Sequence, residues 1–182
     1  LWNRAAEKAL DGVLASLPAL AQDKPKELVV GIATFLSGPA SVFGVPGKNA
    51  ADLLIEELNA KGGILGVPVK PVYVDEGAGT NQLLSEYRRV VQEQDAQVML
   101  GAITSGSCNA LAPVAEDLKV VNVMWDCGTQ TIFEDGKWKY SVRTQGHAGA
   151  EMMATLLYLM KTKPDFKSIA VVNQDYAWGR ES

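Results

Sequence analysis

The sequence predicts an α/β fold built on a doubly wound parallel sheet. Short apolar segments rich in β-branched residues alternate along the chain with longer segments whose apolar residues recur at helical spacing. The apolar segments are continuous, as strands are when helices cover both faces of a parallel sheet. With 182 residues, 47% of them hydrophobic and 21% charged, the chain can bury the core of such a domain.

Each element follows from its local pattern. The apolar runs predict strands over 28–33, 67–74, 98–101, 120–125, 140–143 and 168–173. Helical spacing predicts helices over 48–61, from about 80 onward, over 109–118 and over 148–161. The segment 39–47, which is rich in glycine and proline, is expected to be a loop.

Two local sequence signals predict where one helix ends and the next begins. Gly62-Gly63 is expected to end the first helix, because the residue just past a helix end often adopts the left-handed conformation that glycine enters without steric cost. Thr80 is expected to cap the next helix, whose apolar stripe is Leu84, Tyr87 and Val91.

The N-terminal segment carries a pattern typical of a secretory signal. The apolar run 13–21 ends in Ala19-Leu20-Ala21, as an h-region and its cleavage site do. In residues 1–12, however, two basic side chains are balanced by two acidic ones, so an amphipathic helix or an added arm is the alternative. Residues 1–26 are expected to be this segment and a linker, and the fold to begin near Glu27.

Composition argues against nucleic-acid binding and membrane insertion. The net charge is −4 with a sequence pI near 5.1, and lysines and arginines form no cluster. No apolar run approaches the roughly 18 to 20 residues that span a bilayer. The sequence therefore predicts a soluble body with no nucleic-acid partner and no direct insertion into a membrane.

Cys108 and Cys127 leave two interpretations open. Neither belongs to a CxxC pair, so they give no zinc or redox signature. In an oxidising compartment they could form a disulfide, and in a reducing one they would be small buried side chains. Free thiols are the expectation favoured from the sequence.

The motifs of common enzyme classes are incomplete. Residues 44–49 resemble a phosphate loop but lack its first glycine and its closing Ser or Thr. Residues 104–107 lack the glycines that flank the serine of a nucleophile elbow. The single histidine, His147, is expected at a helix start and not in a catalytic triad. The sequence predicts no enzymatic activity, no cofactor and no metal site.

The loops after the strands carry the candidate site. In a doubly wound sheet, ligands bind outside the carboxyl ends of the strands. The loops there are rich in small hydroxyl residues and aromatics. Residues 105–109 lie where a helix begins, so backbone N–H groups and the helix dipole favour a carboxylate at this place.

A series of short motifs runs in order from about residue 27 to the end of the chain. The motifs include Ser-Gly-Pro at 37–39, Phe43-Gly44, Asn-Ala-Lys-Gly-Gly-Ile-x-Gly at 59–66, Val-Arg-Thr at 142–144 and Asp-Tyr-Ala-Trp-Gly at 175–179. In these motifs the sequence resembles the N-terminal lobe of the periplasmic leucine/isoleucine/valine-binding protein family. It departs from that family at Trp125-Asp-Cys-Gly128, where amino-acid binders commonly carry small residues, and this leaves the ligand's identity open.

The resemblance implies a type I periplasmic-binding-protein fold. Residues 27–144 would form the N-terminal ligand-binding lobe, and residues 145–182 would begin a second, similar lobe. The protein would be the periplasmic or extracellular substrate-binding component of an ABC importer. It would capture a small amino acid or related carboxylate and deliver it to a membrane permease. A ligand-sensing domain on the same fold, for an amide or an amino acid, is the alternative.

The resemblance also assigns ligand contacts in the first lobe. Ser105 and Thr129 would donate hydroxyl hydrogen bonds to the ligand carboxylate, with Gly106 and Ser107 part of the same helix start. Simple helix capping is the alternative for Ser105 and Thr129.

Three further contacts are implied around them. The Cys127 backbone would lie against the α-substituent or ammonium, and Phe43 would wall the pocket. Tyr176 would close on the ligand from the second lobe, whereas Trp178 is expected to serve packing.

Overall fold

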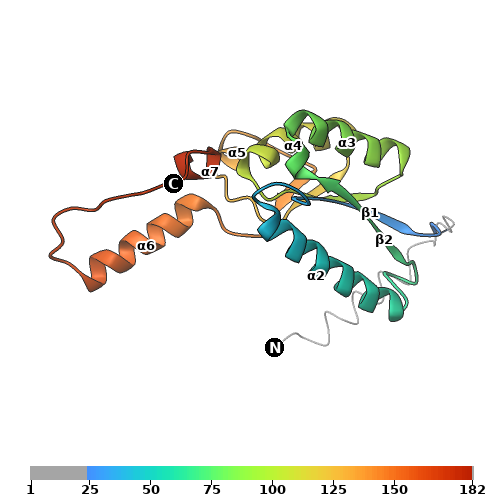
Figure 1. Ribbon diagram of the computed structural model, residues 1–182, viewed down its shortest axis with the longest axis horizontal. Coiled ribbons are helices and arrows are strands. Elements are labelled where there is room, and N and C mark those ends of the chain that lie inside the picture. Colours follow the sequence, from blue (N-terminus) through green and yellow to red (C-terminus); the bar gives the residue numbers. More distant parts are fainter. Residues whose placement is uncertain (1–23, 182) are drawn as a thin grey trace, which may run out of the picture.

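The computed structural model describes residues 24–181, which form a parallel sheet with helices on both faces (Figure 1). The strands are β1 (Leu28–Thr34), β2 (Val69–Asp75), β3 (Val98–Leu100), β4 (Val121–Met124) and β5 (Ser141–Arg143). They lie in the order β2-β1-β3-β4-β5. This confirms the predicted doubly wound fold, while the signal-like segment 1–23 lies outside the described residues.

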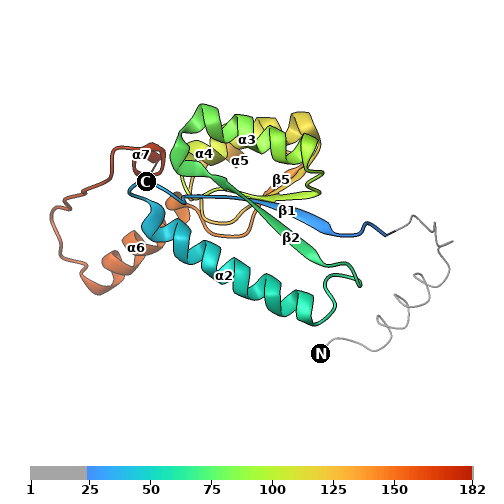
Figure 2. The ribbon, with the colours of Figure 1, turned by 45° about the vertical axis from the view of Figure 1, so that its right-hand side comes forward.

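The helices cover both faces of the sheet. They are α2 (Ser41–Ala60), the 3-10 helix η1 (Glu76–Ala78), α3 (Thr80–Glu93), α4 (Ser105–Leu118), α5 (Thr131–Glu134), α6 (Ala148–Thr162) and α7 (Ala177–Glu181). Figure 2 shows α2 on one face of the sheet and α3 and α4 on the other. Parallel pairing of successive strands brings their carboxyl ends to one edge, where the connecting loops meet.

The hydrophobic core lies between the sheet and the pair α3 and α4. Leu83 and Tyr87 of α3, Met99 of β3, Leu111 of α4 and Met124 of β4 are all fully buried. Burial of a large apolar side chain contributes about 1.5 to 3 kcal/mol, so this cluster fixes α4 against the strands. The start of α4 is thereby held at the carboxyl edge of the sheet.

Two helices begin earlier than the sequence predicts. α2 starts at Ser41 and includes Pro46, so most of the expected loop is helical. Its first turns lie against the end of β1, where a Cβ on Gly44 would stand 2.0 Å from the Phe35 carbonyl oxygen. Only glycine allows this approach, and such tertiary contact outweighs weak local helix propensity. α4 likewise starts four residues early, at Ser105.

The glycine turn after α2 is as predicted, but the start of α3 is not. Gly62 and Gly63 adopt φ values of 98° and 73°. At α3, Gly79 occupies the N-cap position and no side chain caps the helix, so the expected cap by Thr80 is wrong. The buried stripe is Leu83, Tyr87 and Val90, one residue from the predicted Leu84 and Val91, which are half-buried.

The chain after β5 leaves the sheet. Figure 1 shows α6 projecting outward and the chain returning through residues 163–176 to α7, which contacts α4. The strand expected over 168–173 does not form, and Val172 is 96% exposed. A strand is stabilised by hydrogen bonds to a neighbouring strand, and none within residues 24–181 pairs with this segment. The division into lobes 27–144 and 145–182 stays a prediction.

The outward face of α6 is apolar, and this leads to a prediction about association. Met153, Leu157, Tyr158 and Met160 are each more than half exposed, whereas monomeric proteins rarely expose large contiguous apolar patches. We expect the 182-residue chain, prepared alone, to self-associate at micromolar concentration in sedimentation velocity experiments.

A double variant and a control variant test this prediction. Leu157→Gln combined with Met153→Gln should shift the sedimentation profile toward monomer. Lys161→Gln, a control on the same helix, should leave the profile unchanged. A monomeric mass for the unsubstituted chain at every concentration would contradict the prediction.

Candidate ligand-binding site

A pocket of about 270 Å³ lies beyond the carboxyl ends of the strands. Segments far apart in the sequence line it: Phe43 from α2, Ser105 from α4, Asp126 and Gly128 from the loop after β4, and Tyr176 and Trp178 near the C-terminus. We call it the strand-end pocket. Its position is the one at which open α/β sheets bind ligands, and its volume is close to the lower end, about 300 Å³, of typical ligand sites.

Ser105 presents a buried hydroxyl to the strand-end pocket. The side chain is 1% exposed, lines the pocket, and its Oγ has no hydrogen-bond partner within residues 24–181. Thr104, not Ser105, caps α4, because the Thr104 hydroxyl accepts the Ser107 N–H. Capping therefore does not account for Ser105. A buried hydroxyl without a hydrogen-bond partner is costly, and at this position a ligand atom would supply the partner that buried polar groups usually have.

Glu76 holds the backbone just before α4. Its carboxylate is 3% exposed and accepts hydrogen bonds from Ile103 N and Thr104 N, both at 2.9 Å, and from Thr104 Oγ1 at 2.8 Å. These bonds fix the turn from β3 into α4 and so the direction of the helix start. No expectation drawn from the sequence gave Glu76 a role.

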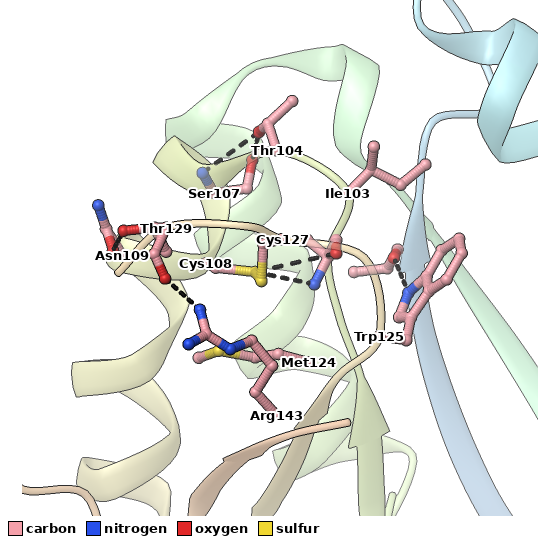
Figure 3. The surroundings of a disulfide bond; sticks show 12 residues. Ile103, Thr104, Ser107, Cys108, Asn109, Met124, Trp125, Cys127, Thr129 and Arg143 are labelled. Atoms are coloured by element: carbon pink, nitrogen blue, oxygen red, sulfur yellow. Dashed lines mark hydrogen bonds between the residues drawn. A yellow bond between two sulfur atoms is a disulfide. The ribbon is translucent and has the colours of Figure 1, made fainter. Parts of the chain in front are cut away.

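A disulfide joins the start of α4 to the loop after β4. Cys108 and Cys127 are bonded, with their Cα atoms 6.4 Å apart and both side chains fully buried (Figure 3). The expectation of free thiols is wrong. The spacing of two isolated cysteines carries no pairing signal, because only the fold brings α4 beside this loop. The bond holds Asp126 and Gly128, which flank Cys127, at the pocket.

Glu181 ties α7 to the same loop. Its carboxylate accepts hydrogen bonds from Thr129 Oγ1 at 2.8 Å, Gln130 N at 2.9 Å and Thr131 Oγ1 at 3.1 Å. Burial by itself would raise the pKa of Glu181, but these hydrogen bonds lower it overall, so the carboxylate is held ionised. On the other side, the Arg143 guanidinium donates to the Thr129 carbonyl (Figure 3). α7 is thus anchored with Tyr176 and Trp178 beside the pocket.

The structure brings three of the predicted site residues together: Phe43, Ser105 and Tyr176 all line the strand-end pocket. The other four lie next to it, and the structure shows none of them among the residues that line it. Gly106 is exposed, and Ser107 bonds to Thr104. Cys127 is buried in the disulfide and Thr129 is bonded to Glu181.

Seven of the lining residues were not predicted as ligand contacts: Ile103, Asp126, Gly128, Gln145, Glu151, Gln174 and Trp178. Asp126 borders the pocket as an exposed residue, and the pKa of its carboxyl is raised by partial desolvation and by the charge of Glu76. Trp178 does pack, as expected, with its ring centroid 6.3 Å from that of Tyr176, but it also lines the pocket. A Cβ on Gly128 would stand 2.5 Å from the Trp178 ring, so glycine is needed there. The departure of residues 125–128 from the family pattern was the one available signal.

Other kinds of site find little support in residues 24–181. No cluster of His, Cys, Asp and Glu in this part of the chain could hold a metal ion. None of its helices has the length and apolar character required to cross a membrane.

The fold and the strand-end pocket are typical of an α/β protein that binds a small molecule. The chain belongs to the periplasmic binding protein family, whose model matches residues 27–182.

Curated relatives agree with this assignment. The chain is 27% identical over 173 residues to the Leu/Ile/Val-binding protein BraC3 of Rhizobium johnstonii, covering 95% of this chain and 46% of that protein. It is 26% identical over 181 residues to the leucine-specific-binding protein of Salmonella typhimurium, covering 97% and 47%. The chain thus spans about half the length of these relatives.

Solved structures share the fold. A solute-binding protein of an ABC transporter from Rhodopseudomonas palustris, in complex with 3,4-dihydroxybenzoic acid, aligns with a TM-score of 0.76 at 22% identity, over 86% of this chain and 42% of that one. A branched-chain amino acid transporter substrate-binding protein from Streptococcus pneumoniae, in complex with isoleucine, aligns with a TM-score of 0.66 at 20% identity, over 75% and 39%.

Proposed function

We propose that this chain is part of the substrate-binding component of an ABC importer. It would capture a small amino acid or related carboxylate between two lobes and deliver it to a membrane permease. The observation that carries the proposal is the Ser105 hydroxyl, which is buried, has no partner within residues 24–181 and faces a pocket at the strand ends.

The chemistry of this position suits a carboxylate. The first N–H groups of an α-helix have no intrahelical acceptor, and the helix dipole places partial positive charge there. In α4 those groups belong to Ser105 and Gly106, beside the Ser105 hydroxyl. Together they offer hydrogen-bond donors to a negatively charged oxygen. The Glu76 and disulfide contacts hold this helix start in place, so little ordering is required on binding.

The relatives support the ligand class. Their names refer to leucine, isoleucine and valine, and each of these amino acids carries a carboxylate that a helix N-terminus can hold. We infer binding and not catalysis, because no base within residues 24–181 is hydrogen-bonded to the Ser105 hydroxyl. A catalytic serine is activated by an adjacent base.

The disulfide supports a location outside the cytoplasm. Disulfides persist in oxidising compartments such as the periplasm and are rare in the cytosol, and Cys108 and Cys127 form one here. We therefore propose a periplasmic or extracellular site of action, where the protein would meet the outer face of its permease.

Isothermal titration calorimetry of the full-length protein tests the proposal. Leucine, isoleucine and valine should be titrated beside their methyl esters, which keep the side chain and the ammonium but lose the carboxylate charge. We expect at least one of the acids to bind and its ester to lose most of the affinity. Esters that bind as tightly as the acids, or the absence of binding by any small carboxylate, would contradict the proposal. Ligand binding with no change in uptake after deletion of the gene would favour the sensing alternative.

A further inference from the structure

The strand-end pocket is acidic and aromatic, which a carboxylate ligand alone does not explain. Asp126 and Glu151 line it, and Glu76 lies close enough to Asp126 to raise its pKa. Within residues 24–181, no lysine, arginine or histidine is among its lining residues. A ligand that was only an anion would meet repulsion on this side of the pocket.

Asp126 differs from Glu76 and Glu181 in how its carboxylate is used. Glu76 and Glu181 each accept several hydrogen bonds from loop backbone and hydroxyl groups. The Asp126 carboxylate makes no hydrogen bond or ion pair within the described part of the chain. It also raises the pKa of Tyr176, second to the effect of burial, so the phenol lies within reach of its charge. Asp126 is exposed at the edge of the pocket and is not held by such contacts, so its carboxylate is available to a ligand.

Aromatic side chains line the same pocket as Asp126. Phe43, Tyr176 and Trp178 line the same pocket, and the rings of Tyr176 and Trp178 are inclined by 28° with centroids 6.3 Å apart. The negative faces of aromatic rings attract a cation that lies within about 6 Å of the ring centroid. A pocket that combines carboxylates with several aromatic rings offers an organic ammonium group both an opposite charge and ring faces.

We propose that Asp126, with Phe43, Tyr176 and Trp178, binds a cationic nitrogen of the ligand and selects for ligands that carry one. This rests on the proposed function, because the same pocket receives the ligand. The ligand class narrows to small zwitterions and organic cations. Uncharged molecules and purely anionic acids of the same shape are bound more weakly. The buried Ser105 hydroxyl serves the opposite, oxygen-bearing end of the ligand.

Two isosteric pairs of probes test this on the full-length protein by titration calorimetry. Choline is compared with its uncharged isostere 3,3-dimethylbutanol, and leucine with 4-methylpentanoate, which lacks only the ammonium. In at least one pair the cationic member should bind at least about tenfold more tightly, as expected for a hydrogen bond or contact with a charged group.

Matched variants then assign the preference to Asp126. Asp126→Asn should remove most of the difference within that pair. Asp117→Asn, a control on the exposed side of α4, should keep it. Because Asp126 makes no contact that holds the fold, the melting temperature of Asp126→Asn should equal that of the parent.

Equal binding within both pairs, or no binding by either cationic probe, would overturn the inference. A preference for the cationic member that survives in Asp126→Asn would overturn it as well. The carboxylate site is tested separately by the methyl esters and by Ser105→Ala. Failure of the cation site with loss of affinity in Ser105→Ala would therefore leave the proposed function standing.

Discussion

Replacing Ser105 by alanine is expected to weaken ligand binding by the full-length protein by roughly ten- to a hundredfold. A hydrogen bond to a charged group contributes about 1.5 to 3 kcal/mol, and each 1.4 kcal/mol is about tenfold in affinity. The hydroxyl makes no hydrogen bond within residues 24–181, so its removal should leave the melting temperature of the unliganded protein nearly unchanged. Calorimetric titration and differential scanning calorimetry measure the two effects.

Ser107→Ala is the matched control for this experiment. The Ser107 hydroxyl is bonded to Thr104 at 2.9 Å and does not line the pocket. We expect the control to lower stability slightly and to spare affinity, the reverse of Ser105→Ala. The ester of the ligand should also be less sensitive to Ser105→Ala than the acid is. If Ser105→Ala lowered stability and left affinity unchanged, the serine would be structural and the carboxylate would be held elsewhere.

Removing the disulfide between Cys108 and Cys127 is expected to destabilise the protein by about 3 kcal/mol, the value typical for a loop of this size. The bond closes a sequence separation of 19 residues and joins α4 to the loop that carries Asp126. Without the bond the unfolded chain has more conformational freedom, which lowers stability. The loop that carries Asp126 is also held less firmly at the pocket, so ligand affinity should fall as well. Urea unfolding with and without a reducing agent gives the change in stability.

The double variant Cys108→Ser, Cys127→Ser provides the control for the reductant. Its unfolding midpoint should match that of the reduced parent and should not respond to reductant. Thiol titration of the unfolded, unreduced parent should find neither of these cysteines free. A parent whose midpoint is indifferent to reductant, or both of whose thiols react without it, would contradict the bond.

The sheet and part of the site could be predicted because their signals are local. Continuous apolar runs are typical of buried parallel strands, and the loops that follow them must meet at one edge. That reasoning, with the family resemblance, placed Phe43, Ser105 and Tyr176 near one another, and all three line the strand-end pocket. The turn at Gly62-Gly63 was predictable for the same reason, because its steric requirement is local.

The remaining features depend on contacts between distant segments. The start of α2 is set by the approach of Gly44 to Phe35, and the disulfide by the packing of α4 beside the loop after β4. Neither contact has a signature in the sequence. Thr129 was assigned to the ligand by resemblance, whereas in this structure its hydroxyl meets Glu181, 52 residues away.

The wrong prediction of a strand over 168–173 has a different cause. The apolar pattern of Ile169 to Val172 is real, but a strand requires a hydrogen-bonding partner, and residues 24–181 supply none. The local pattern indicates which secondary structure a segment is able to form, and the contacts available from neighbouring segments determine whether it forms.

The central claim is that the strand-end pocket holds a small carboxylate ligand through Ser105. Native mass spectrometry of the full-length protein, purified without denaturation, tests it most directly. We predict a bound molecule in one-to-one ratio whose mass corresponds to a small amino acid or related carboxylate, and whose occupancy falls sharply in Ser105→Ala but not in Ser107→Ala. A bound molecule without a carboxylate, or occupancy that is the same in both variants, would contradict the claim.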